Sequence, residues 1–402
     1  MKNPDIHRYE RRLETHRNVV RNSKILECNK ELIFKFEEYG SLIGLSKPRL
    51  AKYLEILKLS AEIINKDFSK VKKEDIMNFV KVINERDYSP WTKQAYKVMI
   101  KRFYKWLKGN DEKYPEEVSW INTNLKKSEL RLPSEGDLLT EKEVSKLIDA
   151  TTNSRDKAFV SVLYESGCRI GEIGNLKIKN VKVDEYGAVL NVFGKTGARQ
   201  IRIINSTSYL ITWINNHPFK DERDTPLWVG FNGSNEVLSY QMFCKILRDI
   251  FKKAKINKRC NPHSFRHARA TFLANHLTEF QMNQYFGWVQ GSDMPSTYVH
   301  LSGREVDNTL LALSGIKSEK EKEKPKLQPK KCPKCDTINS HNARYCCKCA
   351  GILDLQVAME LQEQKEKRNV ADELMNKLIQ DPEVQNLLLQ KVSILEKSFI
   401  KN

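Results

Sequence analysis

AVLNVFGKTGARQIRII, residues 188–204, decides the fold class, because apolar residues alternate on both sides of the turn Gly194-Lys195-Thr196-Gly197. Alternation around a short glycine-containing turn predicts a β-hairpin. Most of the remaining sequence instead repeats its apolar residues every three or four positions, which predicts helices. We therefore expect a mainly α protein with a small β-sheet, an α+β fold, in which the hairpin lies inside a largely helical domain.

Outward from the hairpin, changes in pattern predict the domain boundaries. The apolar spacing loosens over residues 126–137, which predicts a linker. Thr140 followed by Glu143 then forms a capping box that begins a helix. The sequence thus divides into seven parts. They are an N-terminal extension (1–24), a helical domain (25–125), a linker (126–137), a mixed α+β domain (138–316), a charged flexible linker (317–330), a cysteine-rich module (331–353) and a helical tail (354–402).

The net charge indicates a polyanionic partner. Among 402 residues, 69 lysines and arginines exceed 51 aspartates and glutamates, which gives +18. Such a charge favours nucleic acid, and the alternative is a set of solvated basic helices. The sequence contains no run of about 18 apolar residues, the length that would predict a membrane span. Residues 1–12 are polar, unlike a signal peptide. We expect a cytoplasmic protein.

The cysteine spacing predicts a metal site. Cys332-x-x-Cys335 and Cys346-x-x-Cys349 form two CxxC pairs separated by ten residues. Four thiolates at this spacing are typical of a structural zinc ribbon, with an iron–sulfur cluster as the alternative. Cys347 is then a spare thiol and His341 a competing ligand.

The tail predicts two helices, residues 355–380 and 383–400, separated at Asp381-Pro382. The second helix has a short apolar seam, which suits either a partner helix or packing onto its own domain. The seam consists of Leu388, Val392, Leu395 and Phe399.

Three segments of the mixed domain carry side chains suited to phosphate chemistry. Arg169 lies one turn before Glu172, so the pair can hold a guanidinium in place for a phosphate. His263 and Arg266 share a face of the helix expected after Asn261-Pro262. The third segment, residues 286–303, contains a tryptophan and a tyrosine. Separately, these segments are equally consistent with an ion pair, a solvated helix start and a core tyrosine.

Taken in order, these segments resemble the catalytic signature of the tyrosine recombinases, also called the phage integrase family. The resemblance covers about residues 25–316, since the first domain resembles the helical core-binding (SAM-like) domain in its Thr92, Tyr96, Ile100 and Phe103. The sequence after Tyr298 and the cysteine module resemble archaeal members. The matching elements are Gly167-Cys168-Arg169-Ile170-Gly171-Glu172, Lys195 on the hairpin turn, His263-Ser264-Phe265-Arg266-His267, Phe286-Gly287-Trp288 and Tyr298.

The resemblance implies a site-specific DNA recombinase that cleaves and rejoins double-stranded DNA through a 3′-phosphotyrosyl intermediate. It also implies a homotetramer on DNA, no catalytic metal, and a task in integration, excision or resolution. The implied catalytic residues are Arg169, Lys195, His263, Arg266, Trp288 and the nucleophile Tyr298, supported by Glu172 and His267.

Proton transfer is the first requirement of that reaction. A phenol has a pKa near 10, so Tyr298 needs a base, and His263 is the candidate. The leaving 5′-oxygen needs a proton, for which Lys195 is the candidate.

Charge stabilisation is the second requirement. Arg169 and Arg266 would clamp the nonbridging oxygens, and the Trp288 indole N–H would donate to one of them. Glu172 would orient Arg169. His267 would either form a hydrogen bond within the site or have a structural role only.

Two other functions fit the same residues. One is a catalytically inactive DNA-binding or regulatory protein that uses the recombinase scaffold and the zinc ribbon. The other is a type IB topoisomerase-like enzyme. The complete set of catalytic residues argues against the first, and the separate helical domain argues against the second.

Overall fold

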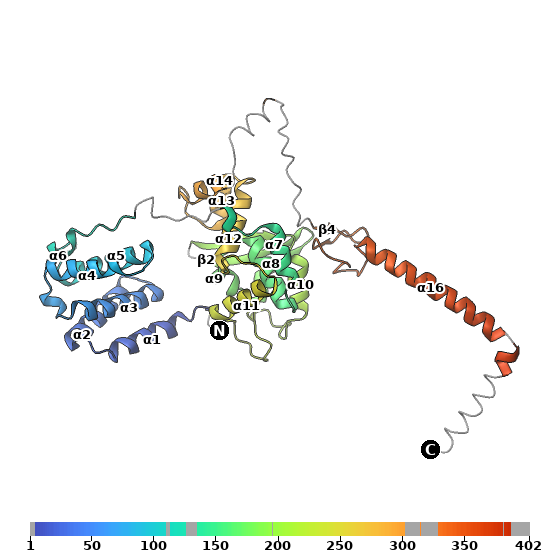
Figure 1. The fold of residues 1–402 in the computed structure, drawn as a ribbon, viewed down its shortest axis with the longest axis horizontal. Coiled ribbons are helices and arrows are strands. Elements are labelled where there is room, and N and C mark those ends of the chain that lie inside the picture. The colour runs from blue at the N-terminus through green and yellow to red at the C-terminus, as the bar shows by residue number, and fades with distance from the viewer. Residues whose placement is uncertain are drawn as a thin grey trace, which may run out of the picture.

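The structure is a computed structural model that describes residues 5–109, 113–125, 135–194, 196–301, 314, 329–380 and 382–386. Its described part is mainly helical and contains a three-stranded and a two-stranded sheet, which confirms the α+β class. Figure 1 shows an N-terminal helical body, a central body with the larger sheet, and a long C-terminal helix. The residue numbers that we predicted for the domain boundaries remain predictions.

The N-terminal body packs its helices around one apolar core. Ser89 caps the basic helix α5 by accepting a hydrogen bond from the Thr92 N–H over 3.2 Å. Helix α1 lies in the range expected as an extension, yet its Leu13 and Val20 are buried in this core. The helices are α1 (Tyr9–Arg21), α2 (Glu27–Leu42), α3 (Lys47–Ile64), η1 (Phe68–Lys70), α4 (Lys73–Glu85), α5 (Pro90–Lys108) and α6 (Glu116–Ser119).

The predicted hairpin is present in the central body. Strands β2 (Gly187–Gly194) and β3 (Gly197–Ile203) are antiparallel, and Gly194 pairs with Gly197 at the turn. A third strand, β1 (Val181–Asp184), pairs with β2 and was not predicted. Its four residues alternate valine with lysine and aspartate and are largely exposed, so the pattern that marks a strand is too short to recognise.

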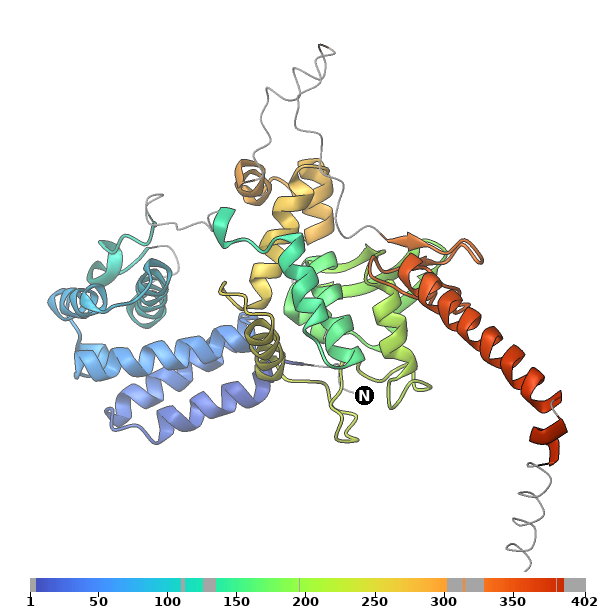
Figure 2. The same ribbon diagram turned by 45° about the vertical axis from the view of Figure 1, so that its right-hand side comes forward.

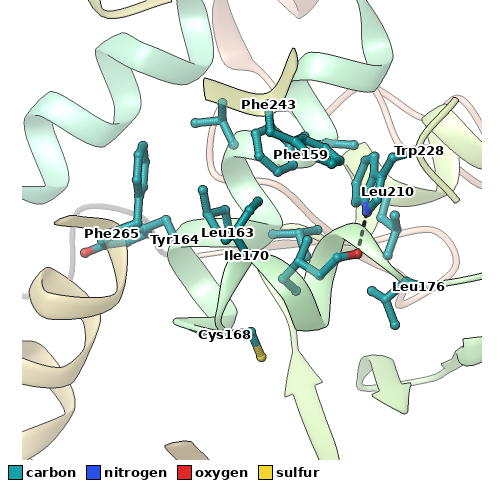
Figure 3. Close-up of a cluster of buried hydrophobic side chains, with 14 of the residues drawn as sticks. Phe159, Leu163, Tyr164, Cys168, Ile170, Leu176, Leu210, Trp228, Phe243 and Phe265 are labelled. Carbon is teal, nitrogen blue, oxygen red and sulfur yellow. Dashed lines mark hydrogen bonds between the residues drawn. The ribbon is translucent and has the colours of Figure 1, made fainter. Parts of the chain in front are cut away.

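Helix α8 forms the centre of the second apolar core. Figure 3 shows its Phe159 and Leu163 among side chains from surrounding elements, where the Trp228 indole N–H donates to the Ile173 carbonyl over 2.8 Å. The capping box at Thr140 is confirmed. The helices are η3 (Glu135–Asp137), α7 (Glu141–Asp149), α8 (Ser154–Ser166), α9 (Ile170–Gly174), η4 (Ile178–Asn180), α10 (Thr207–Asn215), α11 (Tyr240–Lys253), α12 (Pro262–Ala274), α13 (Glu279–Phe286) and α14 (Met294–Leu301).

The C-terminal part consists of the cysteine module and a long helix. The module contains β4 (Lys330–Lys331) and β5 (Ile338–Asn339), and α16 (Leu355–Gln380) extends away from it in Figures 1 and 2. Most of the charged linker, and the seam over residues 388–399, lie outside the described residues. Within the described ranges, none of the helices is long and apolar enough to cross a membrane.

A short segment before α1 packs against the central body. Ile6 is fully buried there, its N–H donates to Asn175 Oδ1 over 3.0 Å, and its carbonyl accepts from the Tyr240 N–H over 2.8 Å. Gly174 makes room for it, since a Cβ at that position would meet Ile6 Cδ1 at 2.8 Å. Residues 5–8 therefore connect the two bodies non-covalently as well as along the chain.

The substitution Ile6→Asp should release this segment, because an unpaired carboxylate is costly to bury among apolar side chains. Without its acceptor, the Tyr240 amide should exchange its hydrogen faster by about tenfold, while amides inside α3 keep their rates. Hydrogen exchange followed by mass spectrometry or NMR measures both. Leu42→Asp is the control, because Leu42 is 82% exposed. An unchanged rate at Tyr240 in the Ile6 variant would contradict the contact.

Candidate active site

Arg169 is held at the start of α9. Gly167 ends α8 with φ 56° and turns the chain so that Arg169 caps the next helix. Its Nη1 donates to Glu172 Oε1 over 3.0 Å, and its backbone N–H donates to Oε2 over 2.9 Å. Glu172 thus binds both ends of Arg169 and fixes where its guanidinium points, which confirms the predicted ion pair.

Glu172 also binds a second arginine, which sequence reasoning missed. Arg199 on β3 donates from Nη1 and Nη2 to the two carboxylate oxygens over 2.8 and 2.7 Å. Burial alone would raise the pKa of the Glu172 carboxyl, but the hydrogen bonds and charge of Arg199, with smaller contributions from Arg169, outweigh it and lower this pKa. Glu172 therefore stays ionised although its side chain is only 3% exposed.

Arg266 lies on α12 and reaches the same region, where it contacts residues that flank Arg169 and Trp288. Its Nη1 donates to the Gly167 carbonyl over 3.0 Å and its Nη2 to the Phe286 carbonyl over 2.8 Å. The guanidinium also lies 5.4 Å from the Trp288 ring centroid. Burial, followed by the charge of Arg169, lowers the pKa of Arg266 to about 10, so it remains a cation at neutral pH.

Tyr298 is buried against Trp288 and His267. The Trp288 and Tyr298 rings stack with centroids 5.4 Å apart and planes 6° apart. A hydrogen bond of 2.8 Å joins the Tyr298 hydroxyl to His267 Nδ1. Burial, partly offset by the positive charge of Arg266, raises the pKa of Tyr298 above its usual 10.0. The phenol is therefore a weak acid that has a proton acceptor beside it.

The hydrogen-bond partner of Tyr298 is His267, whereas the base expected from the sequence is His263. Both lie on α12, with ring centroids 6.4 Å apart, but only His267 is hydrogen-bonded to the tyrosine in the part of the chain that the structure describes. Their positions i and i+4 lie one helical turn apart, so spacing alone could not separate them. Burial, and then the repulsion that a second protonated imidazole at His263 would exert, lowers the pKa of His267.

His263 lies near the cationic side of the site. Desolvation by its surroundings, and then the charges of Arg266 and Arg169, lower its pKa, so the imidazole is neutral at pH 7. Lys195, the sixth expected catalytic residue, lies outside the described residues. Its neighbour Thr196 donates from its hydroxyl to the Gly287 carbonyl over 3.1 Å, which places this end of the hairpin beside Trp288.

An open hollow of about 630 Å³ lies between this end of the hairpin and α13. It is lined both by Arg199 of the ion pair and by the stacked Trp288, and its surface mixes polar with apolar atoms. The lining includes Thr196, Arg199, Gln281, Gln284, Tyr285 and Trp288.

The four predicted metal ligands lie together in the cysteine module. The sulfur atoms of Cys332, Cys335, Cys346 and Cys349 all lie within 4.8 Å of one another, and two pairs are 3.6 and 3.5 Å apart. A tetrahedron of thiolates around zinc has edges of about 3.8 Å, so this set could hold a metal ion. Cys347 is exposed outside the set, and His341 lies against Ser145 instead.

The module also contacts the central body directly. The Ser340 N–H donates to Ser208 Oγ over 3.2 Å, and the Asn342 amide donates to Asp149 Oδ1 over 3.1 Å. Residues 340–342 thus attach the cysteine cluster to α7 and α10.

Sequence comparison identifies the relatives of the chain. Residues 137–305 match the model of the phage integrase family. The tyrosine recombinase XerA of Pyrococcus furiosus is 29% identical over 247 residues, which are 60% of this chain and 80% of that protein. The tyrosine recombinase XerD of Staphylococcus epidermidis is 30% identical over 205 residues, 48% of this chain and 67% of that protein.

Solved structures agree in fold. XerH site-specific recombinase bound to palindromic difH substrate has a TM-score of 0.54 at 16% identity, covering 78% of this chain and 100% of that one. A lambda integrase tetramer bound to a Holliday junction has a TM-score of 0.53 at 14% identity, covering 71% and 80%. Together with the XerD match, these similarities show that the chain belongs to the tyrosine recombinase, or phage integrase, family of site-specific DNA recombinases.

Proposed function

We propose that this tyrosine recombinase cleaves and rejoins double-stranded DNA at specific sites through a 3′-phosphotyrosyl link to Tyr298. One observation carries the proposal: side chains from distant segments form a continuous set of contacts. Arg169 Nη2 lies 3.4 Å from the Gly287 carbonyl, Arg266 lies over Trp288, and Trp288 stacks on Tyr298. Two cations, a nucleophile and a candidate base are therefore gathered in one site.

In the first step, the Tyr298 oxygen forms a bond to phosphorus while the bond from phosphorus to the 5′-oxygen breaks. The phenol proton passes to His267 Nδ1, which is free to accept it when the neutral ring keeps its own proton on Nε2. Because Tyr298 is only 2% exposed, a phosphate reaches its hydroxyl after α14 has shifted. DNA binding thus precedes activation of the nucleophile.

Arg169 and Arg266 balance the negative charge that develops on the nonbridging oxygens. Arg169 is one-third exposed and so accessible to a phosphate, whereas Arg266 is held from behind by two carbonyls. Preorganised cations of this kind need no rearrangement during the reaction. The neutral His263, close to both charges, is placed to donate a hydrogen bond to the same phosphate.

Lys195 is proposed to protonate the leaving 5′-oxygen. Support comes from its place in the sequence between β2 and β3, where the neighbouring Thr196 donates a hydrogen bond to the Gly287 carbonyl next to Trp288. In the second step the incoming 5′-hydroxyl returns its proton to Lys195, and His267 returns the phenol proton to Tyr298 as the DNA strand is rejoined.

Double-stranded DNA, and a homotetramer on it, are the proposed partner and assembly. Exchange between two duplexes needs four cleavages, hence four active sites. The +18 charge supports the DNA partner, and α5 offers it lysines on its half-exposed sides at Lys93, Lys97, Lys101 and Lys105. We also propose that the enzyme lies in the cytoplasm, because that compartment contains the chromosome and the mobile elements.

Zinc is the proposed metal of the cysteine module. Cys332, Cys335, Cys346 and Cys349 would hold it, and it would supply folding energy to a module with little apolar core of its own. Because the module sits on α7 and α10, zinc would also fix where α16 leaves the body.

A covalent-trapping experiment tests the function. Nicked, labelled duplexes from DNA flanking the gene, incubated with the protein and run on denaturing gels, should give a protein-linked band. Tyr298→Phe should lose the band entirely, because phenylalanine has no oxygen to attack phosphorus. Tyr186→Phe, at a 62% exposed tyrosine, should keep it. A band on every duplex whatever its sequence would favour a topoisomerase, and binding without any band would favour the inactive DNA-binding protein.

The pH dependence of cleavage tests the base. The pKa of His267 is lowered from its ordinary value of 6.5, so its imidazole stays neutral at pH 6.5. The single-turnover rate should therefore be constant down to pH 6.5 and should fall at lower pH, as the ring is protonated. His267→Gln should slow cleavage by about 100-fold and abolish this fall. The exposed His276→Gln should change neither. If instead His263→Gln removes the fall and His267→Gln keeps it, the base is His263.

Metal analysis tests the cysteine module. The purified protein should contain one zinc per chain and show no visible absorption of an iron–sulfur cluster. Cys335→Ser should lose the metal and speed hydrogen exchange at the Ser340 amide, which is anchored to Ser208. Cys347→Ser should keep both properties of the wild type. Bound iron, or an unaffected metal content in Cys335→Ser, would contradict the assignment.

A further inference from the structure

Arg199 occupies the junction of the elements that build the active site. It lies on β3, binds both carboxylate oxygens of Glu172, and donates from Nε to the Tyr285 carbonyl over 2.9 Å. Its side chain is 10% exposed. One guanidinium thus joins the hairpin, the start of α9 and the end of α13.

Two glycines leave the space that Arg199 needs. A Cβ on Gly287 would meet Arg199 Nη1 at 2.8 Å, and Gly287 has φ +61°, which favours glycine. A Cβ on Gly194 would meet Glu172 Oε1 at 2.2 Å. The backbone therefore approaches the ion pair from both sides, and larger residues at either position would displace it.

Arg199 itself does not reach a phosphate while it makes these contacts, since its donors are directed at Glu172 and Tyr285. Arg169 shares Glu172 and is the more exposed of the two arginines, with 33% of its side chain accessible against 10%. Removing Arg199 would leave the buried carboxylate with Arg169 as its one remaining cationic partner among the described residues, and would free the segment that leads to Trp288.

We propose that Arg199 is a positioning residue of the recombinase, which holds Glu172 so that Arg169 points toward the phosphate and holds the end of α13 so that Trp288 stacks on the nucleophile. This inference rests on the proposed function. Arg199 would thus support the arginines that bind the phosphate and would take no part in proton transfer.

Single-turnover cleavage of a nicked duplex by the full chain tests the role. Arg199→Met should cut the rate of covalent-complex formation by about 100-fold, the effect of misplacing a catalytic group by about 1 Å. Arg199→Lys, which keeps the charge but not the two-pronged contact, should recover part of the loss. Arg202→Met is the matched control, because Arg202 lies on the same strand in an exposed ion pair with Asp184. It should cleave like the wild type.

A second substrate separates positioning from simple loss of folded protein. A methylphosphonate at the scissile position lacks one nonbridging negative charge, so its cleavage depends less on the arginine clamp. The ratio of wild-type to Arg199→Met rates should therefore shrink by at least about tenfold on methylphosphonate, whereas a smaller folded fraction would lower both rates equally.

Equal ratios on the two substrates, or an Arg199→Met rate equal to that of the wild type, would overturn the inference. These results are distinct from failure of the proposed function, in which the wild type itself forms no covalent complex on either substrate.

Discussion

The carboxylate of Glu172 lies almost fully buried between two arginines, and the geometry of the active site depends on that arrangement. A buried carboxylate is costly unless charged and hydrogen-bonding partners surround it. Arg199 and Arg169 supply four such hydrogen bonds, one of them from a backbone N–H. Because these donors come from β3 and from the start of α9, the sheet and that helix cannot move apart without exposing an unpaired charge.

The same constraint explains how the two cations of the site are kept in place. Arg266 is fixed from behind by the carbonyls of Gly167 and Phe286, and Arg169 by Glu172. Each guanidinium is held by protein on one side, so the positive potential is concentrated where a phosphate would lie. The nucleophile is buried by its stacking on Trp288 and its hydrogen bond to His267, so in the proposed reaction α14 shifts before attack.

Local signals in the sequence predicted much of this fold. The alternation around Gly194 and Gly197 predicted the hairpin, and Thr140 and Asn261 predicted helix starts that the structure confirms. The spacing of the cysteines predicted a set of sulfur atoms that the structure brings together. In each case the information lies within a few neighbouring residues.

What the sequence did not predict depends on contacts between distant segments. Arg199 looks like any strand arginine until the fold places it 2.7 Å from Glu172. The choice between His263 and His267 depends on where α14 packs on α12, and the burial of Ile6 depends on the central body that receives it. None of these contacts leaves a periodic or spaced pattern in the chain.

The most direct test of the account is to identify the amino acid that becomes joined to DNA. The covalent complex formed on a nicked duplex can be digested with nuclease and protease and its cross-linked peptide sequenced by tandem mass spectrometry. The account predicts a nucleotide 3′-phosphate on Tyr298, in the peptide that contains α14. An adduct on a different residue, such as the half-buried Tyr285, would contradict the assignment of the nucleophile and the site built around it.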